Sequence, residues 1–105
     1  MTGGPAFGLS RRILDLVSQA IGRFPQIAEA RIFGSRSMGT YKNGSDIDLA
    51  VFGADLDEAT VLRLSTLLNE ELPIPHHVDV LWYEACENED LKAHIDKFGQ
   101  SLRGA

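Results

Sequence analysis

The sequence predicts one domain of the α/β (α+β) class, a sheet covered by helices. Its 105 residues are enough for one hydrophobic core and too few for two well-packed ones. Hydrophobic residues make up 44% of the chain and charged residues 24%, as in an ordinary globular protein. Segments with strand-like alternation are interleaved with segments of helical periodicity, and this order is typical of a sheet that packs against helices.

The chain is expected to begin with a loose segment, residues 1–9, followed by a single domain over residues 10–105. The first segment is rich in glycine and proline, which disfavour regular structure. Ser10 can cap the first helix, in which apolar side chains recur every three or four residues. This helix is expected to end before Pro25.

Three strands are expected after this helix. The first covers residues 27–33 and is closed abruptly by Gly34 and Ser35, after which a short helical turn can follow. The second, residues 46–52, is the clearest, because its apolar side chains alternate along one face. The third covers residues 77–83.

Two more helices and a turn complete the expected elements. Residues 57–72 carry a stripe of apolar side chains that ends at Pro73 and Pro75. Residues 88–102 are predicted to form a polar closing helix. Residues 41–45 contain the Asn-Gly pair that is typical of a polar turn.

The net charge of −5 argues against a broad nucleic-acid surface, and no direct binding of nucleic acid is expected. Residues 1–52 have a balance of +2 and residues 53–105 a balance of −7, so no basic excess exists to neutralise many phosphates. The basic groups of Arg31, Arg36 and Lys42 could attract a small polyanion locally. Most of the charges are expected simply to be solvated.

A cytoplasmic location is expected. The longest uninterrupted apolar run has four residues, far short of the roughly 20 that cross a membrane. The first residues, MTGGPAFGLSRR, lack the apolar centre of a secretory signal. The only cysteine, Cys86, cannot form an internal disulfide and suits a reducing compartment.

Two acidic residues interrupt the clearest strand. Asp46 and Asp48 lie two positions apart, so both project from one face with Cα atoms about 7 Å apart. Two carboxylates repel by about 4 kcal/mol at 4 Å and an effective dielectric constant of about 20. A divalent cation removes this repulsion, and oxygen ligands suit Mg²⁺. The alternative is a solvent-exposed polar edge without a metal.

Gly34 and Ser35 add a second signal. A glycine directly after an apolar strand permits a tight turn and close approach of a ligand to the backbone. If Ser35 opens a helical turn, its hydroxyl and the nearby amides form a cradle for an anion. The alternative is a plain turn that Ser35 caps. A phosphate cradle beside a carboxylate metal site indicates phosphoryl or nucleotidyl transfer.

Asp79 is a candidate third carboxylate. It interrupts an apolar strand and should face away from its neighbours Val78 and Val80. If this strand lies next to the one that carries Asp46 and Asp48, the three side chains converge. Three carboxylates can hold two divalent ions, which stabilise the attacking and leaving oxygens of an in-line displacement.

The pattern Gly34-Ser35, ten residues, Asp46-Ile-Asp48 and a later strand aspartate resembles the nucleotidyltransferase superfamily that includes DNA polymerase β. The stretch FGSRSMGTYKNGSDIDLAVFG is most similar to the minimal nucleotidyltransferases (MNT) of bacteria and archaea, antitoxin-type partners of helical HEPN proteins. The resemblance covers roughly residues 24–99. It implies a polymerase β-like fold with a small mixed sheet flanked by helices.

The resemblance also implies roles for the acidic residues. Asp46 and Asp48 would each bind both of two Mg²⁺ ions. Asp79 would bind the ion nearer the attacking hydroxyl and help to remove its proton.

The same resemblance implies the nucleotide contacts. Gly34 and Ser35 would hold the β- and γ-phosphates of a nucleoside triphosphate, with ATP the expected one. Arg36 and Ser45 would assist them.

The implied reaction transfers AMP from ATP to a hydroxyl and releases pyrophosphate. In toxin–antitoxin members the acceptor is a tyrosine of the HEPN toxin, so this chain would act as the antitoxin and assemble with a helical HEPN protein. Two alternatives remain, a catalytically idle module that masks its HEPN partner and a small-molecule enzyme similar to antibiotic nucleotidyltransferases. Three repelling acids argue against the first, and the second needs an acceptor domain for which 105 residues leave no room.

Four other residues are expected to lie outside the chemistry. His76 and His77 follow a proline without a cluster of further metal ligands, so a surface position at the start of a strand is expected. Trp82 and Tyr83 are expected to pack rather than stack on a base.

Overall fold

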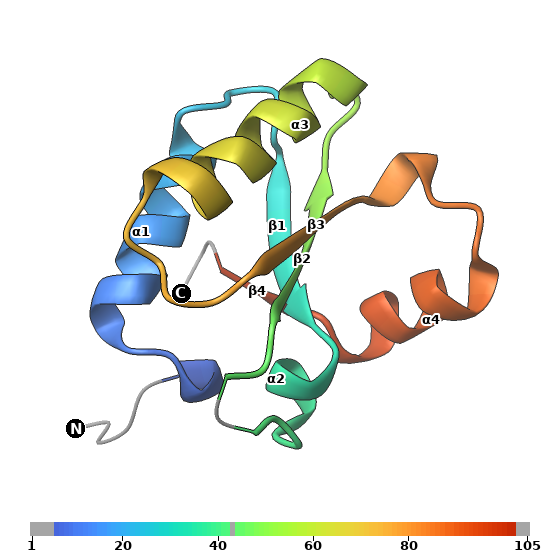
Figure 1. Ribbon diagram of the computed structural model, residues 1–105. Helices are drawn as coiled ribbons and strands as arrows, with labels where there is room; N and C mark the ends of the chain where they lie inside the picture. Colours follow the sequence, from blue (N-terminus) through green and yellow to red (C-terminus); the bar gives the residue numbers. More distant parts are fainter. Residues whose placement is uncertain (1–5, 43, 103–105) are drawn as a thin grey trace.

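The protein is seen here in a computed structural model, which describes residues 6–42 and 44–102. A four-stranded sheet lies at its centre in the order β3-β2-β1-β4 (Figure 1). β1 (Glu29–Phe33) is antiparallel to β2 (Ile47–Phe52) and to β4 (Gln100–Ser101), and β3 (Val78–Trp82) is parallel to β2. The expected α/β (α+β) class, with a small mixed sheet flanked by helices, is confirmed.

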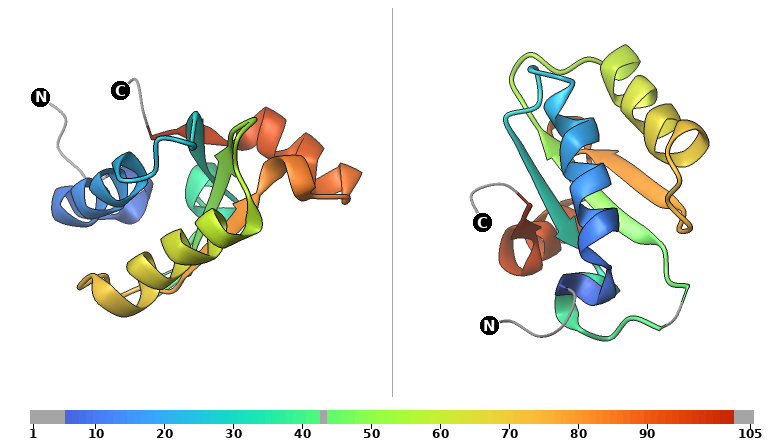
Figure 2. Two further views of the ribbon diagram at one scale, coloured as in Figure 1. Left: turned by 90° about the horizontal axis from the view of Figure 1, so that it is seen from above. Right: turned by 90° about the vertical axis from the view of Figure 1, so that its left-hand side faces the viewer.

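Helices cover both faces of the sheet. In chain order the helical elements are η1 (Ala6–Gly8), α1 (Arg11–Gly22), α2 (Ser35–Met38), α3 (Glu58–Thr66), η2 (Leu67–Glu71), η3 (Tyr83–Ala85) and α4 (Glu89–Phe98). α1 and α3 pack on one face and α4 on the other, as Figure 2 shows. No helix in the described part of the chain is long and apolar enough to span a membrane.

Side-chain caps begin the three longer α-helices. Ser10 accepts a hydrogen bond from the backbone of Ile13 at 3.2 Å, as the sequence predicts. Asp57 caps α3 and Asn88 caps α4 in the same way. The helix expected over residues 57–72 is present, although its last part, η2, has the wider hydrogen-bonding pattern of a π-helix.

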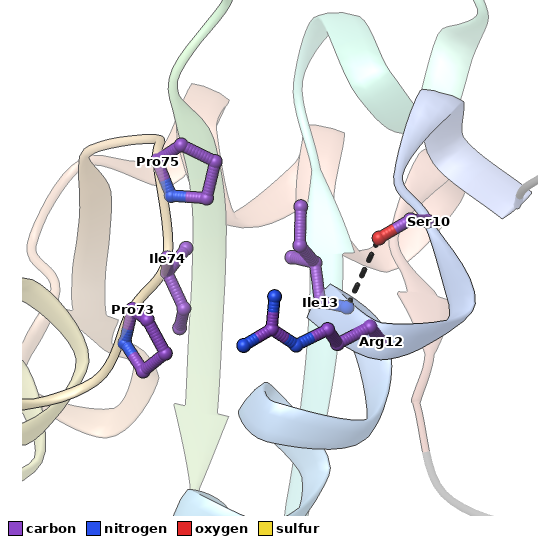
Figure 3. A pocket seen from close by; sticks show the side chains of 6 residues that line it. All are labelled: Ser10, Arg12, Ile13, Pro73, Ile74 and Pro75. Carbon is purple, nitrogen blue, oxygen red and sulfur yellow. Dashed lines mark hydrogen bonds between the residues drawn. The ribbon is translucent and has the colours of Figure 1, made fainter.

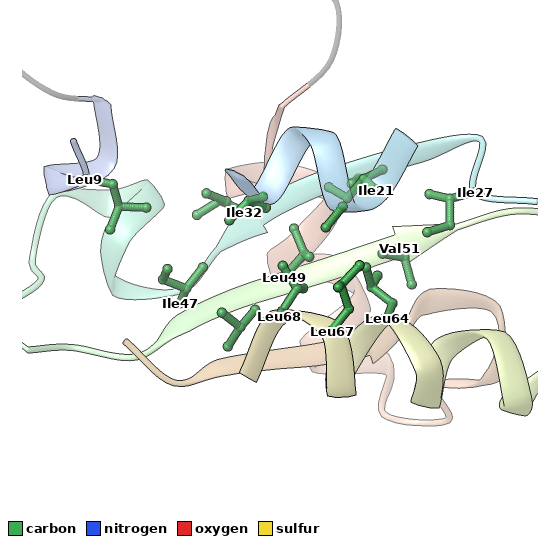
Figure 4. Packing of buried hydrophobic residues seen from close by; sticks show 14 of the residues in the cluster. Leu9, Ile21, Ile27, Ile32, Ile47, Leu49, Val51, Leu64, Leu67 and Leu68 are labelled. Atoms are coloured by element: carbon green, nitrogen blue, oxygen red, sulfur yellow. The ribbon is translucent and has the colours of Figure 1, made fainter. Parts of the chain in front are cut away.

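The main core lies between the sheet and the pair α1 and α3 (Figure 4). Alternate residues of β2, among them Leu49 and Val51, are fully buried against Ile21 of α1 and Leu64 of α3. A smaller cluster on the opposite face joins Ala50 to α4. The two faces of β2 therefore pack against different helices, and each must be filled for the sheet to be stable.

Two expectations about the ends of the domain are wrong. Residues 7–9 of the segment expected to be loose are packed, because Leu9 is 1% exposed and the carbonyl of Phe7 accepts a hydrogen bond from Arg36; residues 1–5 lie outside the described part. The closing helix ends at Phe98 rather than near Leu102. Its last residues form β4, because Gln100 and Ser101 pair with β1 and give that strand its second neighbour.

Candidate functional site

The parallel pairing of β2 and β3 places two of the three aspartates side by side. Asp48 and Asp79 are register partners, so their side chains leave the sheet on the same face. It is the face that α4 covers, because their neighbours Ile47 and Val78 are buried in the main core on the other side. Asp46 lies just before β2 and is exposed.

Gly34 brings the start of α2 against Asp48. Its φ of 74° and ψ of −149° lie in a region that is essentially open only to glycine. A Cβ atom at this position would collide with a carboxylate oxygen of Asp48. The tight turn expected from the sequence is therefore present, and it brings the carboxylate of Asp48 against the backbone of Gly34.

Ser35 is the first residue of α2, and the helix is not capped by a side chain. The residue at the cap position is Gly34, so the alternative of a turn capped by Ser35 does not hold. The hydroxyl that closes this turn belongs to Ser37, which donates to the Gly34 carbonyl at 3.0 Å. Within the described residues the Ser35 hydroxyl has no hydrogen-bond partner, and it is only half-buried.

The carboxylates at this edge of the sheet interact unfavourably. Burial raises the pKa of Asp48 above its usual value, and the negative charges of Asp79 and Asp46 raise it further. Asp48 is therefore a partly buried acid whose charged form is disfavoured by burial and by its acidic neighbours.

These acids fit a hard divalent cation by chemistry, although they do not form a closed ligand set. No group of three His, Cys, Asp or Glu side chains in the described part of the chain is close enough to hold an ion. The carboxylate of Asp79 instead receives a hydrogen bond from Nε2 of His77 at 3.2 Å. Mg²⁺ is usually held by one or two carboxylates together with substrate phosphates, and such a site needs no complete protein cage.

Arg36 is held inside the protein by backbone groups. Its side chain is 3% exposed; Nε and Nη2 donate to the carbonyl of Ser45 at 3.2 and 2.7 Å, and Nη1 donates to the carbonyl of Phe7 at 2.8 Å. Its guanidinium also lies 5.2 Å from the ring centre of Tyr41. These contacts tie α2 to the loop before β2 and to η1.

Ser45 closes the polar turn expected over residues 41–45, in which Asn43 lies outside the described residues. Its hydroxyl accepts a hydrogen bond from the Lys42 amide at 2.8 Å, and its own amide donates to the Lys42 carbonyl at 3.0 Å. Asp46 follows Ser45 directly, so this turn fixes the position of Asp46.

His94 also belongs to this site, although no motif of the sequence points to it. Nε2 of His94, on α4, accepts a hydrogen bond from the Gly34 amide at 3.0 Å. Its position directly before the buried Ile95 was the available signal, because a polar ring beside a core residue needs a partner. The partner lies 60 residues earlier in the chain, and no local pattern reveals it.

The residues expected to pack do so. Tyr83 stacks on Phe52 with ring centres 4.4 Å apart, and its hydroxyl donates to Asp96 at 2.7 Å. Trp82 packs against the main core. His76 lies 3.4 Å from Arg36, whereas His77 bonds to Asp79 and so lies nearer the candidate site than expected.

A surface hollow of about 440 Å³ lies away from the acids (Figure 3). It is formed by the start of α1 and the segment after η2, with Arg12, Ile13 and Ile74 among its walls. The Ser10 hydroxyl that borders it is already used to cap α1. None of the aspartates lines this hollow, so the candidate site is the open edge formed by Gly34, Ser35 and the aspartates.

The family comparison agrees with this geometry. The sequence model of the family described as polymerase beta, nucleotidyltransferase matches residues 17–104, which is most of the chain. The matched region contains each of the acids and the Gly34 turn. No curated protein matches the sequence.

Several solved structures of similar fold come from toxin–antitoxin complexes. A toxin–antitoxin with AMP-PNP has a chain 26% identical, with a TM-score of 0.72 over 88% of this chain and 73% of that one. A mutant of the toxin–antitoxin MntA-HpeT is 28% identical, with a TM-score of 0.67 over 92% and 74%. A tri-AMPylated Shewanella oneidensis HEPN toxin in complex with MNT antitoxin, at 22% identity, has the same fold, with a TM-score of 0.69 over 92% and 74%.

Proposed function

This chain belongs to the polymerase β nucleotidyltransferase family and has the fold of MNT antitoxins, and we propose that it transfers AMP from ATP to a hydroxyl group in a Mg²⁺-dependent reaction. The observation that carries the proposal is the contact between the Gly34 turn and Asp48, whose register partner is Asp79. This contact puts the Gly34 turn and paired carboxylates at one edge of the sheet, which supports binding of a triphosphate there.

In this proposal, one residue of the chain binds the phosphates and three others hold the cations that balance the phosphate charge. The Ser35 hydroxyl, which has no partner within the described residues, donates to the triphosphate over the Gly34 turn. Asp46, Asp48 and Asp79 would hold two Mg²⁺ ions, which supply charge neutralisation for the phosphates. Burial and the like charges of Asp79 and Asp46 raise the pKa of Asp48, and this supports the assignment, because a cation would relieve the repulsion.

The reaction is a displacement at the α-phosphorus of ATP. The acceptor oxygen forms the new bond, the bond to the bridging oxygen between the α- and β-phosphates breaks, and pyrophosphate leaves. The proton of the acceptor hydroxyl passes to Asp79. Asp79 is exposed and is bonded through one oxygen to His77, so its other oxygen is available to an incoming acceptor.

Arg36 and Ser45 assist from behind the site in this proposal. The contacts of Arg36 with the Ser45 and Phe7 carbonyls occupy its guanidinium, so its part is to hold the loop that leads to Asp46. The Ser45 hydroxyl closes the same loop. Their contribution is the fixed placement that in-line displacement requires.

The proposed acceptor is a tyrosine of a helical HEPN toxin, which makes this chain the antitoxin. Toxin–antitoxin complexes supply the similar structures, one of them with AMP-PNP and another with an AMPylated HEPN toxin. The second half of this chain has a balance of −7, and exposed acids of α4 such as Glu89, Asp90 and Asp96 contribute to it. Such a surface suits a basic partner.

Labelled ATP tests the reaction. The chain and a co-expressed HEPN partner are incubated with Mg²⁺ and ATP labelled at either the α- or the γ-phosphate, and both proteins are analysed by mass spectrometry. We expect the α-label alone on a partner tyrosine, and no transfer by the Asp48→Asn variant. Label from the γ-phosphate would mean phosphoryl transfer. Transfer to a small molecule alone would favour the antibiotic-type alternative, and no transfer at all would favour the idle module.

A further inference from the structure

We infer that His94 is a positioning residue of the nucleotide site, which acts by holding the amide of Gly34. The inference rests on the proposed function, because it concerns how the Gly34 turn meets a triphosphate. The observation is the hydrogen bond from the Gly34 amide to Nε2 of His94 at 3.0 Å. It is the contact through which α4 reaches the turn between β1 and α2.

Gly34 needs an external partner to stay in place. The backbone of a glycine can adopt many conformations, and at Gly34 it is held at φ 74° and ψ −149°. The hydrogen bond to His94 fixes the peptide plane before Gly34, and the carbonyl after it is held by Ser37. Both sides of the glycine are therefore bonded, and the direction of Ser35 follows from them.

The same bond decides which groups remain for a phosphate. The Gly34 amide is already satisfied by His94, so it is not a free donor. The Ser35 hydroxyl has no partner in the described part of the chain. His94 and Gly34 therefore set the shape of the turn, and the Ser35 hydroxyl supplies the hydrogen-bond donor to the phosphate.

The imidazole is itself held by packing. Its ring lies edge-on to Phe33 with centres 6.1 Å apart and contacts Phe98 with centres 5.2 Å apart. The lone pair of Nε2 faces Gly34, which places the ring proton on Nδ1. His94 is thus a fixed acceptor, attached to a helix that shares the smaller core with β1 and β2.

Three substitutions of His94 distinguish the effect of losing the hydrogen-bond acceptor from the effect of losing the imidazole ring. His94→Gln places an amide oxygen as far along the side chain as Nε2, so it can still accept from Gly34. His94→Asn places its oxygen one bond closer to the backbone and is the matched control. His94→Leu retains apolar contact with Phe33 and removes the acceptor.

Two measurements are made on each variant of the full chain with its partner. Calorimetry gives the affinity for AMP-PNP with Mg²⁺, and amide hydrogen exchange reports the protection of Gly34 without nucleotide. We expect His94→Leu and His94→Asn to bind about three- to tenfold more weakly, the loss typical of one hydrogen bond, and to expose the Gly34 amide. His94→Gln should restore both, and kcat at saturating ATP should change less than KM.

Each other outcome has a definite meaning. If His94→Leu binds AMP-PNP as the parent does, the inference is wrong while the proposed function stands. Equal losses of AMP-PNP affinity in His94→Gln and His94→Leu, with the Gly34 amide still protected from exchange, would mean that the imidazole contacts the nucleotide directly and does not act through Gly34. If the parent complex binds no AMP-PNP, it is the proposed function that fails, and the inference fails with it.

Discussion

At the carboxyl group of Asp48, burial and the charges of Asp79 and Asp46 hold the pKa above its value in the unfolded chain. Ionisation of such a group lowers the free energy of unfolding as the pH rises from its pKa in the unfolded chain to its pKa in the folded protein. The loss remains at higher pH. We therefore expect Asp48→Asn to unfold at a higher temperature than the parent at pH 7. The difference should shrink as the pH falls below about 4, where the acid is protonated in both states.

The same variant should lose more than about 100-fold in AMP transfer, because the proposed metal site would lose a carboxylate that supplies several kcal/mol of charge stabilisation. Asp55→Asn, at an exposed aspartate outside the site, is the matched control for both measurements. A less stable Asp48→Asn variant at pH 7 would show that the acid supports the fold instead.

Gly34 offers a second test at the residue scale, with Gly39 as its control. Both have positive φ, but Gly39 has open space where a Cβ would lie, whereas at Gly34 that atom meets Asp48. Gly34→Ala should lower the free energy of unfolding by about 2–3 kcal/mol and Gly39→Ala by about 1 kcal/mol. Urea unfolding measures both. Equal losses would show that neither the ψ of −149° at Gly34 nor its contact with Asp48 adds to the cost of a positive φ.

Between elements, Arg36 connects pieces of chain that share few other contacts. Its bonds to the Ser45 and Phe7 carbonyls join α2 to the loop before β2 and to η1. Arg36→Met should cost about 3 kcal/mol, because it leaves buried carbonyls without a donor. Thermal unfolding gives this value, and Arg11→Met, at an exposed arginine, serves as control. A loss below about 0.5 kcal/mol would show that water replaces the guanidinium.

Element positions were largely predictable, and the reasons differ from one element to the next. Alternation of Ile47, Leu49 and Val51 identified β2, and the cap Ser10 identified where α1 begins. The end of α4 was not predictable, because Gln100 and Ser101 have no strand-like pattern and become a strand only by pairing with β1. Tertiary contact overrides local preference there.

In the candidate site, too, some features were predictable from local sequence and others depend on tertiary contacts. Its acids and the Gly34-Ser35 turn are visible in the sequence because their spacing is short and their residue types are unusual in a strand. The hydrogen bond from Arg36 to the Phe7 carbonyl and the bond between Gly34 and His94 join segments that are 29 and 60 residues apart. Such contacts follow from the fold as a whole, and no local pattern carries them.

As a whole, the molecule should unfold in one step. The main core and the smaller cluster lie on opposite faces of one sheet and share β2. Loss of either cluster would expose one face of β2, a strand on which the other cluster also depends, so the two should unfold together. Fluorescence of the single tryptophan, Trp82 in β3, and far-ultraviolet circular dichroism should give one urea midpoint, with a slope of about 1–1.5 kcal/mol per molar. Separate midpoints would show that α4 detaches first.

The long separation between Gly34 and His94 has a consequence for synthesis on the ribosome. The turn, the serine and all three aspartates leave the exit tunnel before the histidine that holds the turn. β4, which completes the second edge of β1, comes later still. A nascent chain therefore carries every proposed phosphate and metal ligand before it can hold them in place, and the site matures only as the last residues of α4 dock.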